Sequence, residues 1–348
     1  MTRTVDVRIN VIRNGVYYSQ LLPISGSPPQ LRMEESGGIP TSFSGDFVVN
    51  PNVDWLSDEL QPVLEVDGTQ YPLGVFMPAT INEQESESTA FVHVEAYDRC
   101  WRVRDTRTES MIYIPQATNY VDAIENLLVS CGVTVILSSP TDETFSFARQ
   151  DWQIGTSYLD IVNALLAEIN YKPLWFDTQG TAILEPVTTP TASNIQHVLD
   201  QRLIQSLLLP EIQRTSDIYS APNVILCICS SPDRDSPMIA TAENTNPESP
   251  LSIARRGRRI VDVYNVSDIA SQTALQDYAN RLLFDTMASD EVITVSTALL
   301  PGFGVGDITA LQYGDLAAIC IESSWTMSLE VGGTMVHTLR KVVFNLAL

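Results

Sequence analysis

The spacing of apolar residues changes character along this chain, and this change constrains its fold more than any other feature. From residue 1 to about residue 105, apolar and polar residues alternate, as in "TVDVRINVIRNG" and "TAFVHVEAYDRCWRV". A period of two is typical of half-buried β-strands. Asp67-Gly68, between two apolar runs, predicts a hairpin turn. We therefore expect residues 1–105 to form a small barrel or sandwich of short strands.

The middle of the chain has the period of helices instead. "TNYVDAIENLLVSCG" carries an apolar stripe, with Thr118 or Asn119 as the candidate N-cap. "TSYLDIVNALLAEINY" repeats this pattern and starts with a capping-box-like Ser157-x-x-Asp160. Each helix is followed by a strand pattern. The two units together predict a compact α+β domain over about residues 106–190.

The last part of the chain returns to patterns typical of strands. "APNVILCICSS" predicts a strand, and one long helix is predicted from Ser267, its expected N-cap, to about Ala288. The sequence after this helix predicts a set of antiparallel strands.

A glycine-rich stretch, "LLPGFGVGD", raises the question of phosphate binding. Its glycines Gly302, Gly304 and Gly306 have the spacing G-x-G-x-G, whereas a dinucleotide fingerprint has G-x-G-x-x-G and opens a helix. The following "DITALQYGD" is typical of a strand, and the chain has no G-K-[ST] of a P-loop. We therefore interpret the stretch as a connection between two strands and expect no cofactor.

The charge of the chain is strongly acidic. Its 42 Asp and Glu residues against 20 Lys and Arg give a net charge of −22, which repels DNA and anionic membranes. No apolar run has the length of a membrane span, so we expect no membrane insertion. The only basic run is "RRGRR", a possible nucleic-acid site or, in the interpretation we prefer, a contact with an acidic neighbouring subunit; its arginines are Arg255, Arg256, Arg258 and Arg259.

Catalytic and metal-binding motifs give weak signals. There is no G-x-S-x-G or H-E-x-x-H. Three isolated histidines lie far apart in sequence, at His93, His197 and His337. The sparse cysteines predict buried thiols rather than disulfides or a metal site; they are Cys100, Cys131, Cys227, Cys229 and Cys320. Two alternatives stay open. The first is a hydrolase, whose candidate catalytic carboxylates are the acid pairs Asp58-Glu59, Asp142-Glu143 and Asp290-Glu291. The second is a carbohydrate-binding module, in which tryptophans would stack on sugar rings; the candidates are Trp55, Trp101, Trp152, Trp175 and Trp325.

Three stretches, taken in order, resemble the baseplate hub proteins of long-tailed bacteriophages and the hub region of their tail-associated proteins. The first is "VLEVDGTQYPLGVFMPATI…FVHVEAYDRCWRVRD" and the second is "YLDIVNALLAEINYKPLWFDTQGTAILEP". The third is "APNVILCICS", leading to the long helix and "LLPGFGVGDITALQYGD…WTMSLEVGGTMVHTLRKV". The resemblance implies a mainly β fold with an α+β insertion: two tube-like β-barrel domains, a small α+β domain and one long helix. By that pattern the first tube-like domain is 1–105 and the peripheral α+β domain is 106–190. The second tube-like domain is 191–348. It is built from residues 191–235 and 290–348, with a loop and helix, residues 236–289, inserted between them.

The resemblance also implies a function. A hub protein is a structural virion component without catalysis. It forms a homotrimeric ring that adapts the hexameric tail tube to the tail tip and lets DNA pass. Expected partners are the distal tail or tail tube protein, tip or fibre proteins and the tape measure protein. The expected location is the virion tail tip, after assembly in the host cytoplasm. Because the chain stops at Leu348 without a peptidase, lysozyme or fibre domain, the wall-degrading activity of larger relatives is not expected.

Overall fold

The computed structural model describes residues 3–35, 38–85, 90–188, 190–191, 193–203, 206–216, 221–230, 236–247, 249–266, 269–288, 291–304 and 306–342. Strands hold 45% of the residues and helices 15%, so the fold is mainly β, as the sequence predicts. All five cysteines are free and buried, which confirms the interpretation of their pattern.

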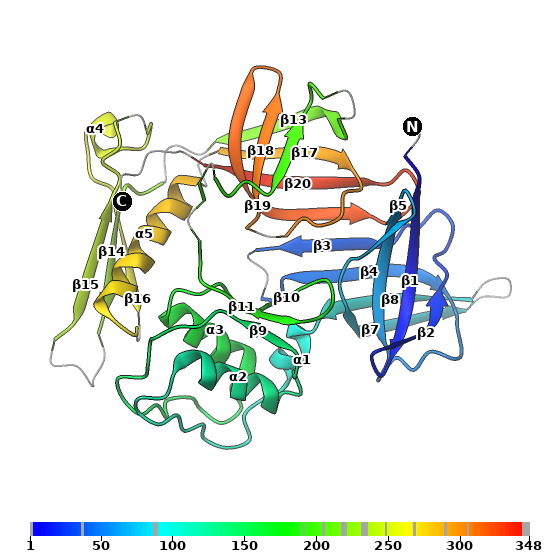
Figure 1. Ribbon diagram of the computed structural model, residues 1–348, viewed down its shortest axis with the longest axis horizontal. Coiled ribbons are helices and arrows are strands. Elements are labelled where there is room, and N and C mark those ends of the chain that lie inside the picture. The colour runs from blue at the N-terminus through cyan, green and yellow to red at the C-terminus, as the bar shows by residue number, and fades with distance from the viewer. Residues whose placement is uncertain are drawn as a thin grey trace.

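The first β region forms one half of a large, mostly antiparallel sheet (Figure 1). The turn at Asp67 and Gly68 has positive φ at both residues, 50° and 81°, as a two-residue hairpin with the right twist requires. This turn joins β5 to β6 and confirms the predicted hairpin. The strands are β1 (Val5–Arg13), β2 (Val16–Leu21), β3 (Gln30–Glu34), β4 (Thr41–Val48), β5 (Glu59–Val66), β6 (Thr69–Pro72), β7 (Phe76–Glu85) and β8 (Ala90–Asp98).

The second β region completes the same sheet. Its strands are β12 (His197–Asp200), β13 (Leu208–Ser216), β17 (Glu291–Ala298), β18 (Ile308–Tyr313), β19 (Leu316–Ser328) and β20 (Thr334–Lys341). Strand β19 pairs with β3, placing Trp325 opposite Met33, so both regions share one 14-stranded sheet and one apolar core. Among the described strands the main order runs from β13 at one end to β2 at the other, without closing on itself.

A compact α+β unit lies below the large sheet in Figure 1. It contains α1 (Cys100–Asp105), α2 (Tyr120–Ser130), β9 (Ile136–Ser138), α3 (Tyr158–Glu168), β10 (Trp175–Phe176) and β11 (Ala182–Leu184). Asn119 caps α2 by accepting hydrogen bonds from the backbone N–H groups of Val121 and Asp122, which decides between the two N-cap candidates. Ser157 caps α3 in the same way. Both helices have the predicted apolar stripes, and these stripes form a core of their own.

The third part is a small sheet covered on one face by the long helix (Figure 1). Its elements are β14 (Val224–Cys229), β15 (Met238–Glu243), α4 (Ile253–Arg256), β16 (Val261–Val266) and α5 (Gln272–Ala288). The predicted start of the long helix is wrong: α5 begins at Gln272, because Ser271 Oγ accepts the Ala274 N–H as a cap. Ser267, the predicted cap, lies outside the described residues.

Strand β14 has different partners from the rest of the second β region. It pairs with β15 and β16, not with the large sheet. The predicted division groups β14 with the strands of 290–348. The division into domains stays a prediction.

Candidate functional site

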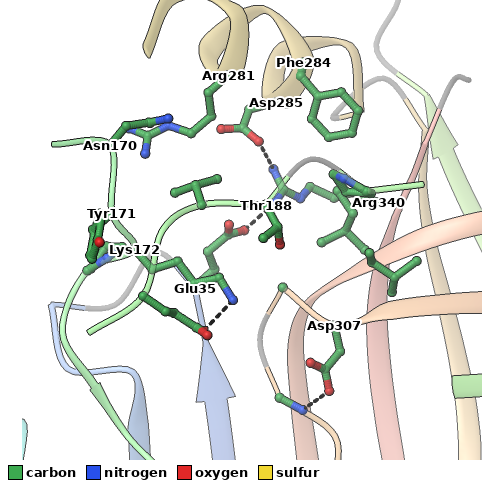
Figure 2. Close-up of a pocket in the computed structure, with 18 of the residues that line it drawn as sticks. Glu35, Asn170, Tyr171, Lys172, Thr188, Arg281, Phe284, Asp285, Asp307 and Arg340 are labelled. Atoms are coloured by element: carbon green, nitrogen blue, oxygen red, sulfur yellow. Dashed lines mark hydrogen bonds and ion pairs between the residues drawn. The ribbon is translucent and has the colours of Figure 1, made fainter. Parts of the chain in front are cut away.

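An open cleft of about 1340 Å³ lies where the three parts of the chain meet. One wall comes from β3, β19, β20 and the residues next to them. A second comes from residues 163–175 of the α+β unit, and a third comes from α5. The connection from β11 to β12 also runs along it. We call this space the junction cleft (Figure 2).

The charged centre of the junction cleft is Arg340. Its Nη2 lies 2.7 Å from Glu35 Oε2 and its Nη1 lies 3.9 Å from Asp285 Oδ1 (Figure 2). Only 14% of the Arg340 side chain is exposed, against 46% of Glu35 and 41% of Asp285. Withdrawal from solvent raises the pKa of both carboxyl groups, because it outweighs the attraction of Arg340.

Three buried polar atoms in the cleft wall lack a hydrogen-bond partner within the described residues. They are Asn170 Oδ1, Trp175 Nε1 and Arg340 Nε. Buried polar groups in proteins are nearly always paired, with protein, water or ligand. Asn170 also has a φ of 57°, a left-handed conformation uncommon outside glycine. All three atoms have almost no accessible surface, so a hydrogen bond to a ligand in the cleft requires these side chains to turn toward it.

The glycine-rich stretch forms one rim of the cleft. The Asp307 carboxylate accepts the Gly304 N–H at 2.7 Å and a Gln196 side-chain N–H at 2.8 Å, and it lies 2.8 Å from His197 Nε2. Gly302 and Gly306 have φ of 88° and 81°. Because β18 follows rather than a helix, the predicted connection between two strands is confirmed.

One histidine lies in an arrangement that resembles a catalytic triad. His337 Nδ1 is 2.9 Å from Glu322 Oε2, and Nε2 is 3.0 Å from Thr297 Oγ1. All three residues have 0% exposure, and burial raises the pKa of Glu322. A set without exposed atoms does not face a substrate, so we interpret it as a polar link between β17, β19 and β20. The third histidine, His93, pairs with Asp46 at 2.7 Å.

The described members of the predicted acid pairs are not part of the lining of the junction cleft. Asp58 pairs with Arg13 at 2.7 Å, and Glu59 pairs with Arg99 at 2.8 Å. Glu143 accepts a hydrogen bond from Ser271. Asp142 is exposed and Glu291 pairs with Lys341 at 2.7 Å, whereas Asp290 lies outside the described residues.

The tryptophans offer little open stacking surface. Trp325 is buried and donates to the Phe303 carbonyl oxygen. Trp101 is covered on its ring by both Tyr97 and Arg104. Arg149 lies over the Trp152 ring, and Trp55 packs against the large core. Among the five, only Trp175 lines the junction cleft.

The arginine run lies between β15 and β16, away from the cleft lining. Arg255 Nε donates to the Pro247 carbonyl at 3.2 Å, and Arg256 Nη1 donates to the Ala221 carbonyl at 2.7 Å. Arg259 pairs with Glu243 at 2.6 Å. Arg258 is exposed.

Sequence patterns do not reveal the cluster of Glu35, Asp285 and Arg340, because the three residues come from distant strands and a helix that meet only in the folded chain. No group of three or more His, Cys, Asp or Glu in the described part of the chain is arranged to hold a metal ion. Among the helices described, none has the length and hydrophobicity of a membrane span.

Comparison with known proteins connects this fold to phage tails. No protein-family model matches the sequence, and no curated protein matches it. The fold is similar to that of a tail protein from Neisseria meningitidis, with a TM-score of 0.66 and 13% identity over 96% of each chain.

Two prophage proteins are similar as well. The 43 kDa tail protein of prophage MuSo2 from Shewanella oneidensis has a TM-score of 0.66 and 9% identity, covering 96% of this chain and 98% of its own. A prophage tail protein from Listeria monocytogenes has a TM-score of 0.59 and 12% identity, covering 95% and 94%. The chain therefore has the fold of phage tail proteins, and the resemblance noted in the sequence is confirmed at the level of fold.

Proposed function

We propose that this chain is a structural protein of a phage tail, located at the tail tip as the baseplate hub. One observation carries the proposal. Phage tail proteins match this fold over nearly the whole of both chains, at TM-scores up to 0.66. Such a match covers the α+β unit and the small sheet as well as the large sheet, so it concerns the whole architecture.

The proposed assembly is a homotrimeric ring that adapts a hexameric tail tube to the tail tip. Each chain would contribute its two β regions, so three chains offer six similar surfaces. The distal tail or tail tube protein would bind one side, and tip or fibre proteins the other. The tape measure protein is a further proposed partner. Assembly would take place in the host cytoplasm before the virion is complete.

Charge supports a role in DNA passage. Three chains together carry −66, three times the −22 of one chain. Like charges facing each other destabilise an interface, so the carboxylates are expected on open surfaces, including a channel wall. A negative wall repels DNA and keeps it from adhering during ejection.

The proposed subunit contact uses the arginine run. Arg256 and Arg259 already bond within the chain, whereas Arg258 is exposed and Arg255 makes one long bond through Nε. We therefore expect Arg255 and Arg258 to contribute most to an acidic neighbour, with Arg256 and Arg259 supporting them.

Electron microscopy of the purified protein tests this proposal. A three-fold ring is expected for the parent, and loss of the ring is expected for Arg255→Glu/Arg258→Glu at physiological salt. The matched control is Arg107→Glu/Arg202→Glu, which makes the same charge change at two other exposed arginines. A double mutant that assembles as well as the parent shows that the arginine run is not the contact.

A second candidate function is hydrolysis of cell-wall sugars by a pair of acids. The observation that favours it is the raised pKa of Glu35 and Asp285 in an open cleft. A zymogram on bacterial cell walls, with Glu35→Gln as the control variant, decides between the candidates. We expect no clearing by either protein, because the proposed hub role needs no catalysis.

A further inference from the structure

The junction cleft has the size and walls of a site for a polypeptide segment. Its volume of about 1340 Å³ exceeds the roughly 300–1,000 Å³ of typical small-molecule pockets. Apolar side chains form much of its lining, including Tyr171, Val187, Phe284 and Ile321. An open boundary built from three parts of the chain leaves room for an extended segment.

The unpaired polar atoms of the cleft wall have the polarity that a peptide backbone satisfies. Trp175 Nε1 and Arg340 Nε are donors, and Asn170 Oδ1 is an acceptor. Each peptide unit brings one C=O acceptor and one N–H donor, so a bound segment pairs both kinds of atom.

The charge of the cleft lining selects a basic segment. Five carboxylates line it against three cationic side chains, and the cations already have acidic neighbours. Lys172 pairs with Glu185 at 2.8 Å, and Arg340 with Glu35 at 2.7 Å. The Arg340 guanidinium is shared between Glu35 and Asp285. An added Lys or Arg would bring a further positive charge to this pair of carboxyl groups.

We propose that the junction cleft binds an extended segment of a partner protein that carries a Lys or Arg among apolar residues. The peptide backbone would pair with Asn170 and Trp175 after their side chains turn toward the cleft, and the basic side chain would lie near Glu35 and Asp285. This binding needs only one chain, so it does not depend on the formation of a ring.

The first test pans a random dodecapeptide phage-display library against the full-length protein. The matched control is Thr188→Trp, because Thr188 is an exposed residue of the cleft lining (Figure 2) and indole fills the space beside it. We expect enriched peptides with one or two basic residues flanked by apolar ones, binding the parent at least about tenfold more tightly than the filled variant. Failure to enrich such peptides, or equal binding to both proteins, overturns the proposal.

The second test uses an enriched peptide in fluorescence polarisation with two mild variants. Trp175→Phe removes an unpaired N–H, so we expect weaker peptide binding by about tenfold without a lower melting temperature. Asp277→Asn removes an exposed carboxylate of the lining and should weaken binding about threefold, whereas the exposed Asp142→Asn outside the cleft should not. If Trp175→Phe leaves the affinity unchanged, the bound peptide does not occupy the cleft as proposed.

A crystal structure of the complex gives the final outcome. Peptide density across Trp175 supports the proposal, and ordered water alone at the three polar atoms overturns it. The ring assay is independent of both tests, because panning and polarisation are carried out on the parent chain whatever its oligomeric state. Absence of a ring together with specific peptide binding would refute the hub proposal and leave this one standing.

Discussion

Glu322 and His337 are the most deeply buried ionisable pair described in the large sheet, each with 0% exposure. Glu322→Leu removes the acceptor for His337 Nδ1 and leaves a buried polar ring nitrogen without a partner. We expect a loss of about 3 kcal/mol in the free energy of unfolding, because breaking a buried pair leaves the remaining partner unpaired in an apolar environment. Glu322→Gln keeps an acceptor and should cost about 1 kcal/mol. Urea denaturation measures both, and equal losses would contradict the pairing argument.

Asp98 gives the clearest pH dependence. Burial raises its pKa to about 6, although the N–H groups of Cys100 and Thr41 favour its charged form. The unfolded value is about 4, so between these values the folded chain binds more protons than the unfolded chain. The stability contributed by Asp98 is therefore full below about pH 4 and falls as the pH rises through 6.

The measurement compares the parent with Asp98→Asn by urea denaturation at pH 5 and pH 7. We expect the variant to be less stable at both values, since it loses one of two acceptor oxygens. The difference in unfolding free energy between parent and variant should become smaller toward pH 7, because the parent then holds a charged carboxylate in its core. A gap that widens with pH would show that the backbone N–H groups outweigh burial.

At the scale of elements, local signals were sufficient for the two short helices. Asn119 and Ser157 precede apolar stripes, and each caps the helix that follows. Asn119→Ala removes the acceptor for two N–H groups and should cost about 1 kcal/mol of unfolding free energy. Ser130→Ala, at the exposed end of the same helix, should change stability by less than about 0.5 kcal/mol. Thermal unfolding of both variants checks the difference, and equal effects would contradict the capping role.

Elements whose neighbours are distant in sequence were harder to predict. "APNVILCICSS" predicts a strand correctly, but its partners are fixed by α5 and by β15 and β16, which no local pattern specifies. The same holds for the junction cleft. Glu35, Asp285 and Arg340 each have an ordinary sequence context, and only the pairing of β3 with β19 and the position of α5 bring them together.

At the scale of the whole molecule, one arginine links the large sheet to the α+β unit. Arg99 forms a two-pronged pair with Glu59 on β5 and donates to the Gly180 carbonyl at 2.8 Å. A methyl group at Gly180, where φ is 79°, would lie 2.8 Å from Arg99 Nη1. Gly180→Ala therefore combines backbone strain with displacement of this arginine.

The matched control for that substitution is Gly155→Ala. Gly155 also has a positive φ, 89°, but an added methyl group there would have open space around it. Both changes should destabilise the α+β unit by about 1 kcal/mol through backbone strain. We expect Gly180→Ala to lose about 1 kcal/mol more, and hydrogen exchange should quicken on both sides of the Arg99 contact. Identical losses in the two variants would mean that Arg99 contributes little to the link.

The pairing of β3 with β19 has a consequence for synthesis of the chain. Glu34 pairs with Ser324, 290 positions later. At ribosomal rates of 5–20 residues per second, one side of β3 stays unpaired for about 15 to 60 s after it has emerged. An unpaired strand edge is a template for aggregation, and charged side chains are the usual protection against it. Arg32 and Glu34, which pair with each other at 2.8 Å, place charges of this kind on β3, the strand whose edge waits for β19.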